Sequence, residues 1–200
     1  MKVLRCSDRA KFPELFEEMF RGRAAVFHDR LQWPVQVENG LEIDFYDREL
    51  NPVYILDLDG CGHVRGSLRV LPTTATTMIK REFIDFFVES VDIVDPFTWE
   101  CTKFCVHSND SATSIRLLLA LHKLCRQSGI ERIIGLYELQ MERVYARIGW
   151  EPERLATAKP GFGRLGVGLW HVDKLSLHRM NHKLLKRRAS SNVHSVIATD

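Results

Sequence analysis

Long apolar runs are missing from this 200-residue sequence, and their absence excludes two classes of protein. Charged side chains interrupt the first twenty residues throughout, so we expect no secretory signal peptide. No segment approaches the roughly 20 consecutive apolar residues that a membrane-spanning helix needs. We therefore expect a protein of the cytoplasm without a membrane span.

Paired cysteine motifs are also missing, which excludes the sites that cysteine usually builds. The five cysteines, an odd number without a CxxC pair, are Cys6, Cys61, Cys101, Cys105 and Cys125. This pattern fits neither a disulfide framework nor a zinc site. We expect reduced thiols, with Cys101 and Cys105 packed as small apolar side chains, and no bound metal.

A strong charge of either sign is absent as well. The 28 Lys and Arg residues nearly balance 26 Asp and Glu residues, and a net charge of +2 does not favour a nucleic-acid partner. The hydrophobic fraction of 45% can fill a core in a chain of this length. We expect one domain over residues 1–190 and a flexible tail over residues 191–200.

Basic residues gather near the C-terminal end. Between residues 175 and 188 the chain has no acid but carries the bases Arg179, Lys183, Lys186, Arg187 and Arg188. Such a run is either the solvated face of a helix or a docking surface for an acidic partner. The sequence leaves both interpretations open.

Apolar periodicity predicts alternating helices and strands. Helical patterns cover residues 9–20, 24–33, 81–90, 111–128 and 140–149, the first with caps at Ser7 and Asp8. Strand patterns cover residues 53–58, 63–71, 98–106, 131–137 and 166–172. The acidic, turn-rich residues 39–52 favour no regular structure. This order predicts an α/β (α+β) fold, in which a mixed sheet has helices on both faces and the long helix joins a parallel central strand pair.

The segment GFGRLG, Gly161 to Gly166, matches the G-x-G-x-x-G pattern of dinucleotide-binding loops. That function needs a strand before the pattern and a helix after it. Here Pro160 precedes the pattern and a strand pattern follows it. We interpret the segment as a glycine-rich loop.

Charged residues also lie in or beside segments that should pack, namely Arg23, Asp44, Asp47, Arg69 and Glu100. Ionised side chains are almost never buried without a partner. One interpretation is a set of structural ion pairs. The other is a pocket that holds a zwitterion or a carboxylate, because the arginine fork matches a carboxylate.

With their neighbours, these residues resemble the acyl-homoserine-lactone synthase family, the bacterial autoinducer synthases. The first part of the match is R-x-x-x-F, then W, then D-x-x-D, then G-x-x-R-x-L-P-T-T, at Arg23, Phe27, Trp33, Asp44, Asp47 and Arg69. The second part is WECTKFCV at residues 99–106, with the hallmark acid at Glu100, and RIGW at residues 147–150. One position departs: where the family has an arginine, this chain has Lys103, which keeps the charge and loses the planar fork.

The resemblance implies a GNAT-like acyltransferase with a splayed parallel strand pair. Family members use S-adenosylmethionine as a substrate and not as a cofactor. Its amine attacks the thioester of an acyl chain on acyl carrier protein and forms an amide. Its carboxylate then displaces methylthioadenosine and closes the lactone, a quorum-sensing signal.

Glu100 is implied to take the proton from the attacking amine. The alternative is a purely structural role, in which Glu100 pairs with Arg69 or Lys103. Backbone N–H groups from Phe104 to Val106 are expected to stabilise the oxyanion.

The other site residues are implied to bind S-adenosylmethionine. Asp44 and Asp47 would hold its cationic end, while Arg23 and Arg69 organise those carboxylates or meet its carboxylate. Further along the chain, Lys103, Phe104 and Val106 join this binding set.

Residues 21–33 are expected to form a lid. Phe27 and Trp33 would cover the adenosyl group and exclude water. We expect this segment to be mobile without ligand.

The acyl pocket is expected at Gly135, where family members selective for 3-oxo chains have a threonine. Glycine lacks that hydroxyl, so we expect an acyl chain without the oxo group and a wider pocket. The basic residues expected to dock the acidic carrier protein are Arg147, Arg154, Lys159 and Arg164, together with the tail.

An acyl- or aryl-coenzyme A donor is an alternative to the carrier protein. HSNDSATS, residues 107–114, lacks the glycine-rich loop that holds pyrophosphate in ordinary GNAT enzymes, which favours the carrier protein. Two further alternatives are a generic N-acetyltransferase and a ligand-binding module on a degenerate acyltransferase fold. The oligomeric state is left open.

Overall fold

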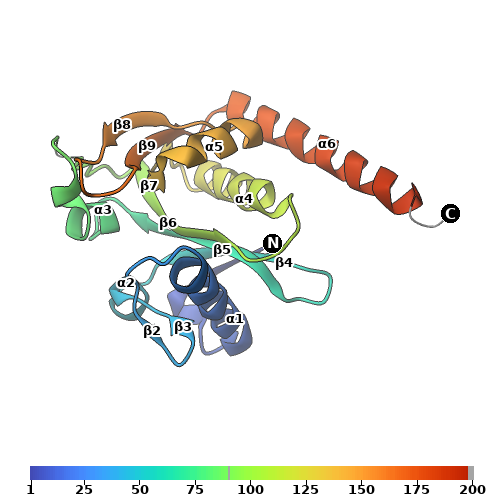
Figure 1. Ribbon diagram of the computed structural model, residues 1–200, viewed down its shortest axis with the longest axis horizontal. Coiled ribbons are helices and arrows are strands. Elements are labelled where there is room, and N and C mark those ends of the chain that lie inside the picture. Colours follow the sequence, from blue (N-terminus) through green and yellow to red (C-terminus); the bar gives the residue numbers. More distant parts are fainter. Residues whose placement is uncertain (90, 198–200) are drawn as a thin grey trace. The chain divides into compact units, whose positions relative to one another are not determined.

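The computed structural model describes residues 1–89 and 91–197, with side chains as far as residue 187 outside that gap (Figure 1). It divides into two compact units. The first holds Met1–Leu71 and Thr102–Leu117, and the second holds Pro72–Cys101 and Leu118–Asp200. Strand β6 (Thr98–Val106) and helix α4 (Thr113–Gln127) contribute residues to both units.

The first unit is built on antiparallel strands. Its elements are β1 (Lys2–Arg5), η1 (Cys6–Asp8), α1 (Pro13–Arg23), η2 (Ala24–Arg30), β2 (Val37–Glu38), β3 (Leu41–Glu42), α2 (Phe45–Glu49), β4 (Val53–Leu58) and β5 (Val64–Pro72). The strand order is β1-β4-β5-β6, and β2 pairs only with β3. The predicted pairing of the strands over 53–58 and 63–71 is confirmed by β4 and β5, which are antiparallel with Tyr54 opposite Arg69.

Helix α1 buries one face against this sheet. Phe16, Met19 and Phe20 recur at helical spacing and are almost fully buried. They pack with Tyr54 of β4, whose ring lies edge-on to Phe16 at a centroid distance of 5.5 Å. This packing fixes the C-terminal end of α1, where Arg23 is located.

The second unit contains the parallel strand pair. Its other elements are α3 (Met78–Arg81), η3 (Ile84–Phe86), β7 (Arg132–Glu138), η4 (Leu139–Met141), α5 (Glu142–Ile148), β8 (Glu153–Thr157), β9 (Leu165–His171) and α6 (Lys174–Ile197). The strand order is β6-β7-β9-β8, with β6 parallel to β7 and the other pairs antiparallel. Pairing of β6 with β7 covers Thr98–Glu100 and Arg132–Ile134. The predicted fold, a mixed sheet with a parallel pair joined by the long helix, is confirmed.

The two faces of β7 and β9 carry different cores. Ile134 and Val167 pack with Ile79 and Phe87. On the other face, Tyr137, Tyr145 and Trp170 form an edge-to-face aromatic cluster with centroid distances of 5.1 to 5.9 Å.

Several predicted boundaries are wrong. Helix α1 begins at Pro13 with Phe12 as its N-cap, so Ser7 and Asp8 lie in η1 and do not cap it. The segment over 81–90 is not one helix, because its described part holds the end of α3 and the short η3. Residues 39–52 contain β3 and α2, and strands β1 and β8 were not predicted. The loop interpretation of GFGRLG is confirmed for residues 161–164, which lie between β8 and β9 with Gly161 and Gly163 at φ of 96° and 80°. Its last two residues, Leu165 and Gly166, begin β9.

The C-terminal basic run lies on α6, which continues to Ile197 and therefore enters the range 191–200 expected to be a flexible tail. Residues 198–200 and the side chain of Arg188 lie outside the described residues. Within the described residues, no helix is both long and apolar enough to cross a membrane. All five cysteines are free thiols.

Candidate functional site

Arg23 ends helix α1 with a guanidinium that is almost fully buried. Its Nε donates to Oε2 of Glu42 at 2.6 Å, and its terminal nitrogens donate to both oxygens of Asp47 at 3.1 and 2.8 Å. The two-pronged contact with Asp47 uses the planar geometry that distinguishes arginine from lysine. Arg23 therefore ties α1 to β3 and α2.

Asp44 and Asp47 form the reciprocal cap of α2. Oδ1 of Asp44 accepts from the N–H groups of Tyr46 and Asp47, and Oδ2 of Asp47 accepts from the N–H of Asp44. A five-residue helix has little stability of its own, so this capping box is what defines it. It also holds the two carboxylates side by side.

Arg69 lies in the middle of β5 and is completely buried. Its Nη1 and Nη2 donate to Oδ1 and Oδ2 of Asp44 at 2.5 and 2.9 Å. Nη1 also donates to Asp47 at 2.8 Å, and Nε donates to the hydroxyl of Thr102 at 2.9 Å. One guanidinium thus links β5, α2 and β6.

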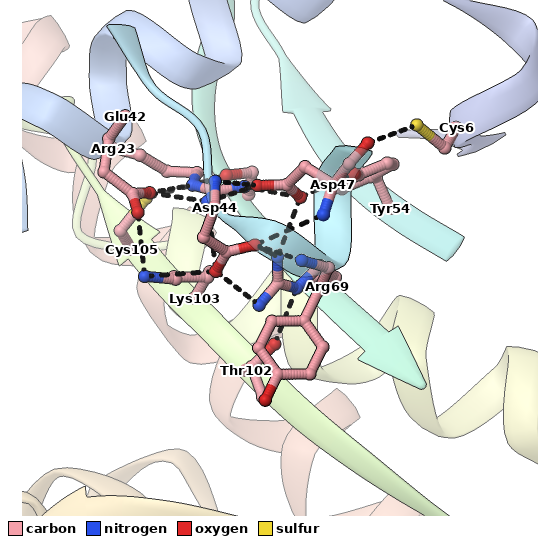
Figure 2. A network of polar contacts seen from close by, with 12 residues as sticks. Cys6, Arg23, Glu42, Asp44, Asp47, Tyr54, Arg69, Thr102, Lys103 and Cys105 are labelled. Atoms are coloured by element: carbon pink, nitrogen blue, oxygen red, sulfur yellow. Dashed lines mark hydrogen bonds and ion pairs between the residues drawn. The ribbon is translucent and has the colours of Figure 1, made fainter. Parts of the chain in front are cut away.

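Glu42 is a further member of this group and was not predicted from the sequence. It is 1% exposed and accepts from Nζ of Lys103 at 2.9 Å in addition to Arg23. Lys103 also lies 3.6 Å from Asp44. Figure 2 shows Asp44 between Lys103 and Arg69.

The resulting charged cluster contains three acids and three bases, namely Glu42, Asp44, Asp47, Arg23, Arg69 and Lys103 (Figure 2). Equal numbers of opposite charges make it possible to bury so many ionised groups together. The side chain of Asp44 is 19% exposed, whereas the other five are at most 7% exposed. Asp44 is therefore the member of the cluster that a ligand can reach most easily.

The surroundings of Asp47 and of its hydrogen-bond partner Tyr54 shift the pKa of both side chains. Burial by itself raises the pKa of Asp47, but the positive charges of Arg23 and Arg69 outweigh it and hold that pKa well below its usual range. The pKa of Tyr54 is raised by burial and by Asp47, to which its hydroxyl donates at 2.6 Å. Asp47 thus stays a carboxylate and Tyr54 stays a neutral donor near neutral pH.

Phe27 and Trp33 lie beside the charged cluster. Phe27 is buried in the π-helix η2, and its ring is 5.3 Å from that of Trp33 at an angle of 32°. The N–H of Trp33 also donates to the backbone carbonyl of Phe27 at 2.8 Å, which ties Trp33 to the end of η2. Nζ of Lys103 lies 5.3 Å from the centroid of Phe27, so the aromatic pair adjoins the charges.

Lys103 interrupts strand β6 with an unusual backbone conformation. Its φ is 51°, in the left-handed region that non-glycine residues rarely occupy. Such a residue inside a strand changes the direction of the backbone groups that follow, here those of Phe104 and the half-buried Val106. Strained backbone of this kind is concentrated at functional sites.

Glu100 lies in the second unit and is 1% exposed. Its two carboxylate oxygens accept from the N–H groups of Met78 and Ile79 at 2.8 and 2.9 Å. No pattern in the sequence indicates these backbone partners. Because side chains two residues apart leave a strand on the same face, Glu100 shares a face of β6 with Thr102.

Gly135 lies in β7 opposite Gly168 of β9. A Cβ added to Gly135 would come within 3.1 Å of the carbonyl oxygen of Cys101 and 3.4 Å of the ring of Trp170. The space beside this glycine is thus bordered closely by Trp170 of the aromatic cluster.

The four residues expected to dock a carrier protein have different surroundings. Arg147 and Arg164 are exposed. Arg154 is paired with Glu142 at 2.7 Å, and Nζ of Lys159 donates to the carbonyl of Asp85 at 3.0 Å. Among the described residues, no group of three side chains is arranged to hold a metal ion.

The structure therefore brings Arg23, Asp44, Asp47, Arg69 and Lys103 together in the first unit, with Phe27 and Trp33 beside them, and places Glu100 and Gly135 in the second. The sequence offered one overlooked signal for Glu42, which is two residues before Asp44 in an alternating acidic and apolar stretch, LEID. Its contact with Lys103, 61 residues away, had no signal.

Comparison with known proteins gives consistent matches. The family model for autoinducer synthases matches residues 9–173. An acyl-homoserine-lactone synthase of Rhizobium etli is 46% identical over 183 residues, which is 88% of this chain and 86% of that protein. An acyl-homoserine-lactone synthase of Aliivibrio fischeri is 31% identical over 154 residues, 73% of this chain and 79% of that protein.

Solved structures show the same fold. The acyl-homoserine-lactone synthase LasI matches with a TM-score of 0.77 and 26% identity over 90% of this chain and 92% of its own. The coenzyme A-dependent synthase BjaI, solved with S-adenosylmethionine and isopentyl-coenzyme A, matches with a TM-score of 0.80 over 91% and 87%. At 23% identity, this second likeness concerns the fold alone.

Proposed function

Because this chain belongs to the acyl-homoserine-lactone synthase family, whose members are acyltransferases, we propose that its charged cluster is the binding site for S-adenosylmethionine. In this proposal the amine of S-adenosylmethionine attacks an acyl thioester and forms an amide. The carboxylate of the same molecule then displaces methylthioadenosine and closes the lactone ring. S-adenosylmethionine is consumed as a substrate, and the enzyme works in the cytoplasm.

The observation that carries the proposal is the exposed edge of the charged cluster at Asp44. The buried acids Glu42 and Asp47 are each held by two bases. Asp44 lies 2.5, 3.6 and 3.9 Å from Arg69, Lys103 and Arg23, and its side chain is nevertheless 19% exposed. A carboxylate held in this way can receive a cationic group without rearranging. Asp44 then contacts the substrate.

The arginines have the role of positioning residues. Arg23 and Arg69 are almost fully buried and bind carboxylates of the protein, which supports the organising role expected for them over direct contact with the substrate carboxylate. Phe27 and Trp33 supply the apolar surface for the adenosyl group. Because Phe27 is already packed at 4% exposure, Trp33, which is half-buried, is the part of the lid that moves.

Glu100 is the proposed acceptor for the proton of the attacking amine. Two backbone N–H groups, those of Met78 and Ile79, fix the position of its carboxylate. A base must be within reach of the proton that it removes, directly or through one water. The backbone N–H groups from Phe104 to Val106, just after the left-handed Lys103, are the proposed donors to the oxyanion.

The proposed acyl donor is acyl carrier protein. In the loop before α4, Oδ1 of Asp110 accepts from the N–H of Ala112, and Oδ2 pairs with Arg65 and Arg116 at 2.9 and 2.8 Å. A helix N-terminus that already holds a carboxylate is a poor site for the pyrophosphate of coenzyme A. This arrangement supports the carrier protein over a coenzyme A donor.

For the acyl chain, we propose a group without a 3-oxo substituent, because Gly135 offers no hydroxyl. The neighbouring ring of Trp170 supports an apolar wall at this position. It does not support the wider pocket that a glycine alone suggests.

The test is to mix the purified protein with S-adenosylmethionine and acyl carrier protein loaded with an octanoyl chain. We expect equal amounts of methylthioadenosine and octanoyl-homoserine lactone, measured by chromatography and mass spectrometry. Octanoyl-coenzyme A serves as the matched donor. A higher kcat/KM with coenzyme A would overturn the carrier-protein proposal, and the absence of lactone with every acyl thioester tried would overturn the proposed reaction.

A further inference from the structure

Net charge is distributed unevenly between residues 1–173 and the C-terminal part that contains α6. Residues 174–200 hold six of the 28 Lys and Arg residues but only one of the 26 Asp and Glu residues. Residues 1–173 are left with 22 basic and 25 acidic side chains, a net charge of −3 against +5 for the C-terminal part. An acidic partner is therefore repelled by most of the chain and attracted by α6, which would also orient its approach.

The outer side of α6 presents this charge to solvent. Its exposed basic side chains include Lys174, His178, Arg179, His182 and Lys183, and we call these five the α6 basic surface. Among the described residues, Lys174, Arg179 and Lys183 form no ion pair. Their charge is available to a partner.

The inner side of α6 is anchored in the second unit. Met180 is completely buried, and Ser176 forms a 3.1 Å hydrogen bond with the buried His122 of α4. Gly149 at the end of α5 packs so closely on α6 that a Cβ there would lie 2.9 Å from the Cβ of Arg179. Figure 1 shows that α6 (red) extends past α5. The contacts of Met180, Ser176 and Arg179 with the second unit hold the basic surface on a fixed element.

Two large apolar side chains are also exposed on α6, Leu175 at 56% and Leu185 at 64%. They are ten residues apart and set among cations, whereas the apolar Met180 faces inward. A helix that lies on a membrane needs a continuous outward apolar face, which this part of α6 does not have. Apolar contacts with a polar rim around them are instead the usual anatomy of a protein interface.

We propose that the α6 basic surface docks an acidic helix of the acyl carrier protein, with Leu175 and Leu185 as the apolar contacts. This rests on the proposed function, because the partner is the proposed acyl donor. It places the interface on α6, away from Arg154 and Lys159, whose side chains already have partners within the second unit.

The test compares the wild-type enzyme with the double variant Arg179→Glu, Lys183→Glu. We expect the KM for octanoyl-carrier protein to rise at least about fivefold at low salt, with kcat and the KM for S-adenosylmethionine unchanged. Raising the salt from about 50 to about 500 mM should remove the difference in the KM for octanoyl-carrier protein between the variant and the wild type, because exposed charges are screened. The matched control, Lys11→Glu with Lys123→Glu, makes the same change in net charge at two exposed lysines and should behave like the wild type.

An unchanged KM in the α6 variant, or an equal rise in the control, would overturn the docking proposal. Flotation with phosphatidylglycerol vesicles that the α6 variant abolishes, while its KM stays at the wild-type value, would assign the surface to a membrane. Direct titration of the carrier protein into the wild type and into the α6 variant measures the docking affinity, and it decides the docking proposal even if no lactone forms. Failure of docking is thereby distinguished from failure of the proposed reaction.

Discussion

Arg69 holds Asp44 through both ends of its guanidinium, with Nη1 2.5 Å from Oδ1 and Nη2 2.9 Å from Oδ2. The pair joins the centre of β5 to the N-cap of α2, so neither partner can turn without breaking two hydrogen bonds. Of the charged cluster, the acid held in this way is also the one most open to solvent. Its orientation is consequently set before a ligand arrives, which is the condition for a preorganised binding site.

Replacing Arg69 by lysine should keep the charge and lose the fork. A single ammonium cannot reproduce the donors that now meet Asp44, Asp47 and Thr102. We expect the KM for S-adenosylmethionine to rise at least about tenfold and the free energy of unfolding to fall by about 1–3 kcal/mol. Steady-state kinetics and urea denaturation measure both. Arg48→Lys, at an exposed ion pair, is the control, and a variant at position 69 with the same kinetics as that control would contradict the role given to the fork.

Asp47 should make the protein sensitive to acid. Its pKa in the folded state lies below the value in the unfolded chain, because Arg23 and Arg69 outweigh the effect of burial. The stabilisation is therefore fully present above about pH 4 and is lost as the pH falls towards the folded pKa. We expect Asp47→Asn to lower the free energy of unfolding by about 3–5 kcal/mol at pH 7 and to flatten its decline below about pH 4. Equal slopes for variant and wild type would show that another group controls acid unfolding.

Glu100→Gln should abolish most of the activity at neutral pH. The amide also directs an N–H group at one of the two backbone donors, Met78 or Ile79, so a loss of about 1–3 kcal/mol of stability is expected as well. The dependence of kcat/KM on pH separates the loss of a catalytic base from the loss of stability. If Glu100 removes the proton of the amine, the deficit in kcat/KM should shrink above about pH 8, where an α-amino group is already neutral. A deficit that stays constant with pH would leave Glu100 a structural role only.

How far the sequence predicts this fold depends on the length and burial of each element. The long helix α4 and strand β6 are clear because their apolar patterns extend over 15 and 9 residues. Strands β1 and β8 have four and five residues and few buried positions, so no periodicity marks them. Helix α2 was missed because five residues do not complete two turns, although the D-x-x-D spacing of its capping box was visible.

The candidate site was predictable in part for a different reason. An arginine inside a strand pattern, such as Arg69, must be paired, and the family resemblance indicated where its partners lie in the chain. The partners of Glu42 and Glu100 could not be predicted. Both depend on segments brought close only by the fold: β6 with β3 for Glu42, and the start of α3 with β6 for Glu100.

Substitutions of Gly135 should separate the effect of a hydroxyl from the effect of size. Gly135→Ala adds a Cβ 3.1 Å from the backbone oxygen of Cys101, so we expect a loss of about 1 kcal/mol of stability and an unchanged product profile. Gly135→Thr should shift the products towards 3-oxo chains. Mass spectrometry of lactones formed from an equal mixture of acyl donors measures this. The same profile for both variants would show that the hydroxyl does not determine selectivity.

The most direct test of the charged cluster as the S-adenosylmethionine site is calorimetric titration of that substrate into the wild type and Asp44→Asn. Asparagine keeps the size of the side chain and removes the charge that faces solvent, so we expect affinity to fall at least about tenfold. Glu17→Gln, at an exposed acid of α1, should bind like the wild type. Equal affinity of Asp44→Asn and the wild type for S-adenosylmethionine would contradict the proposal that the charged cluster binds this substrate.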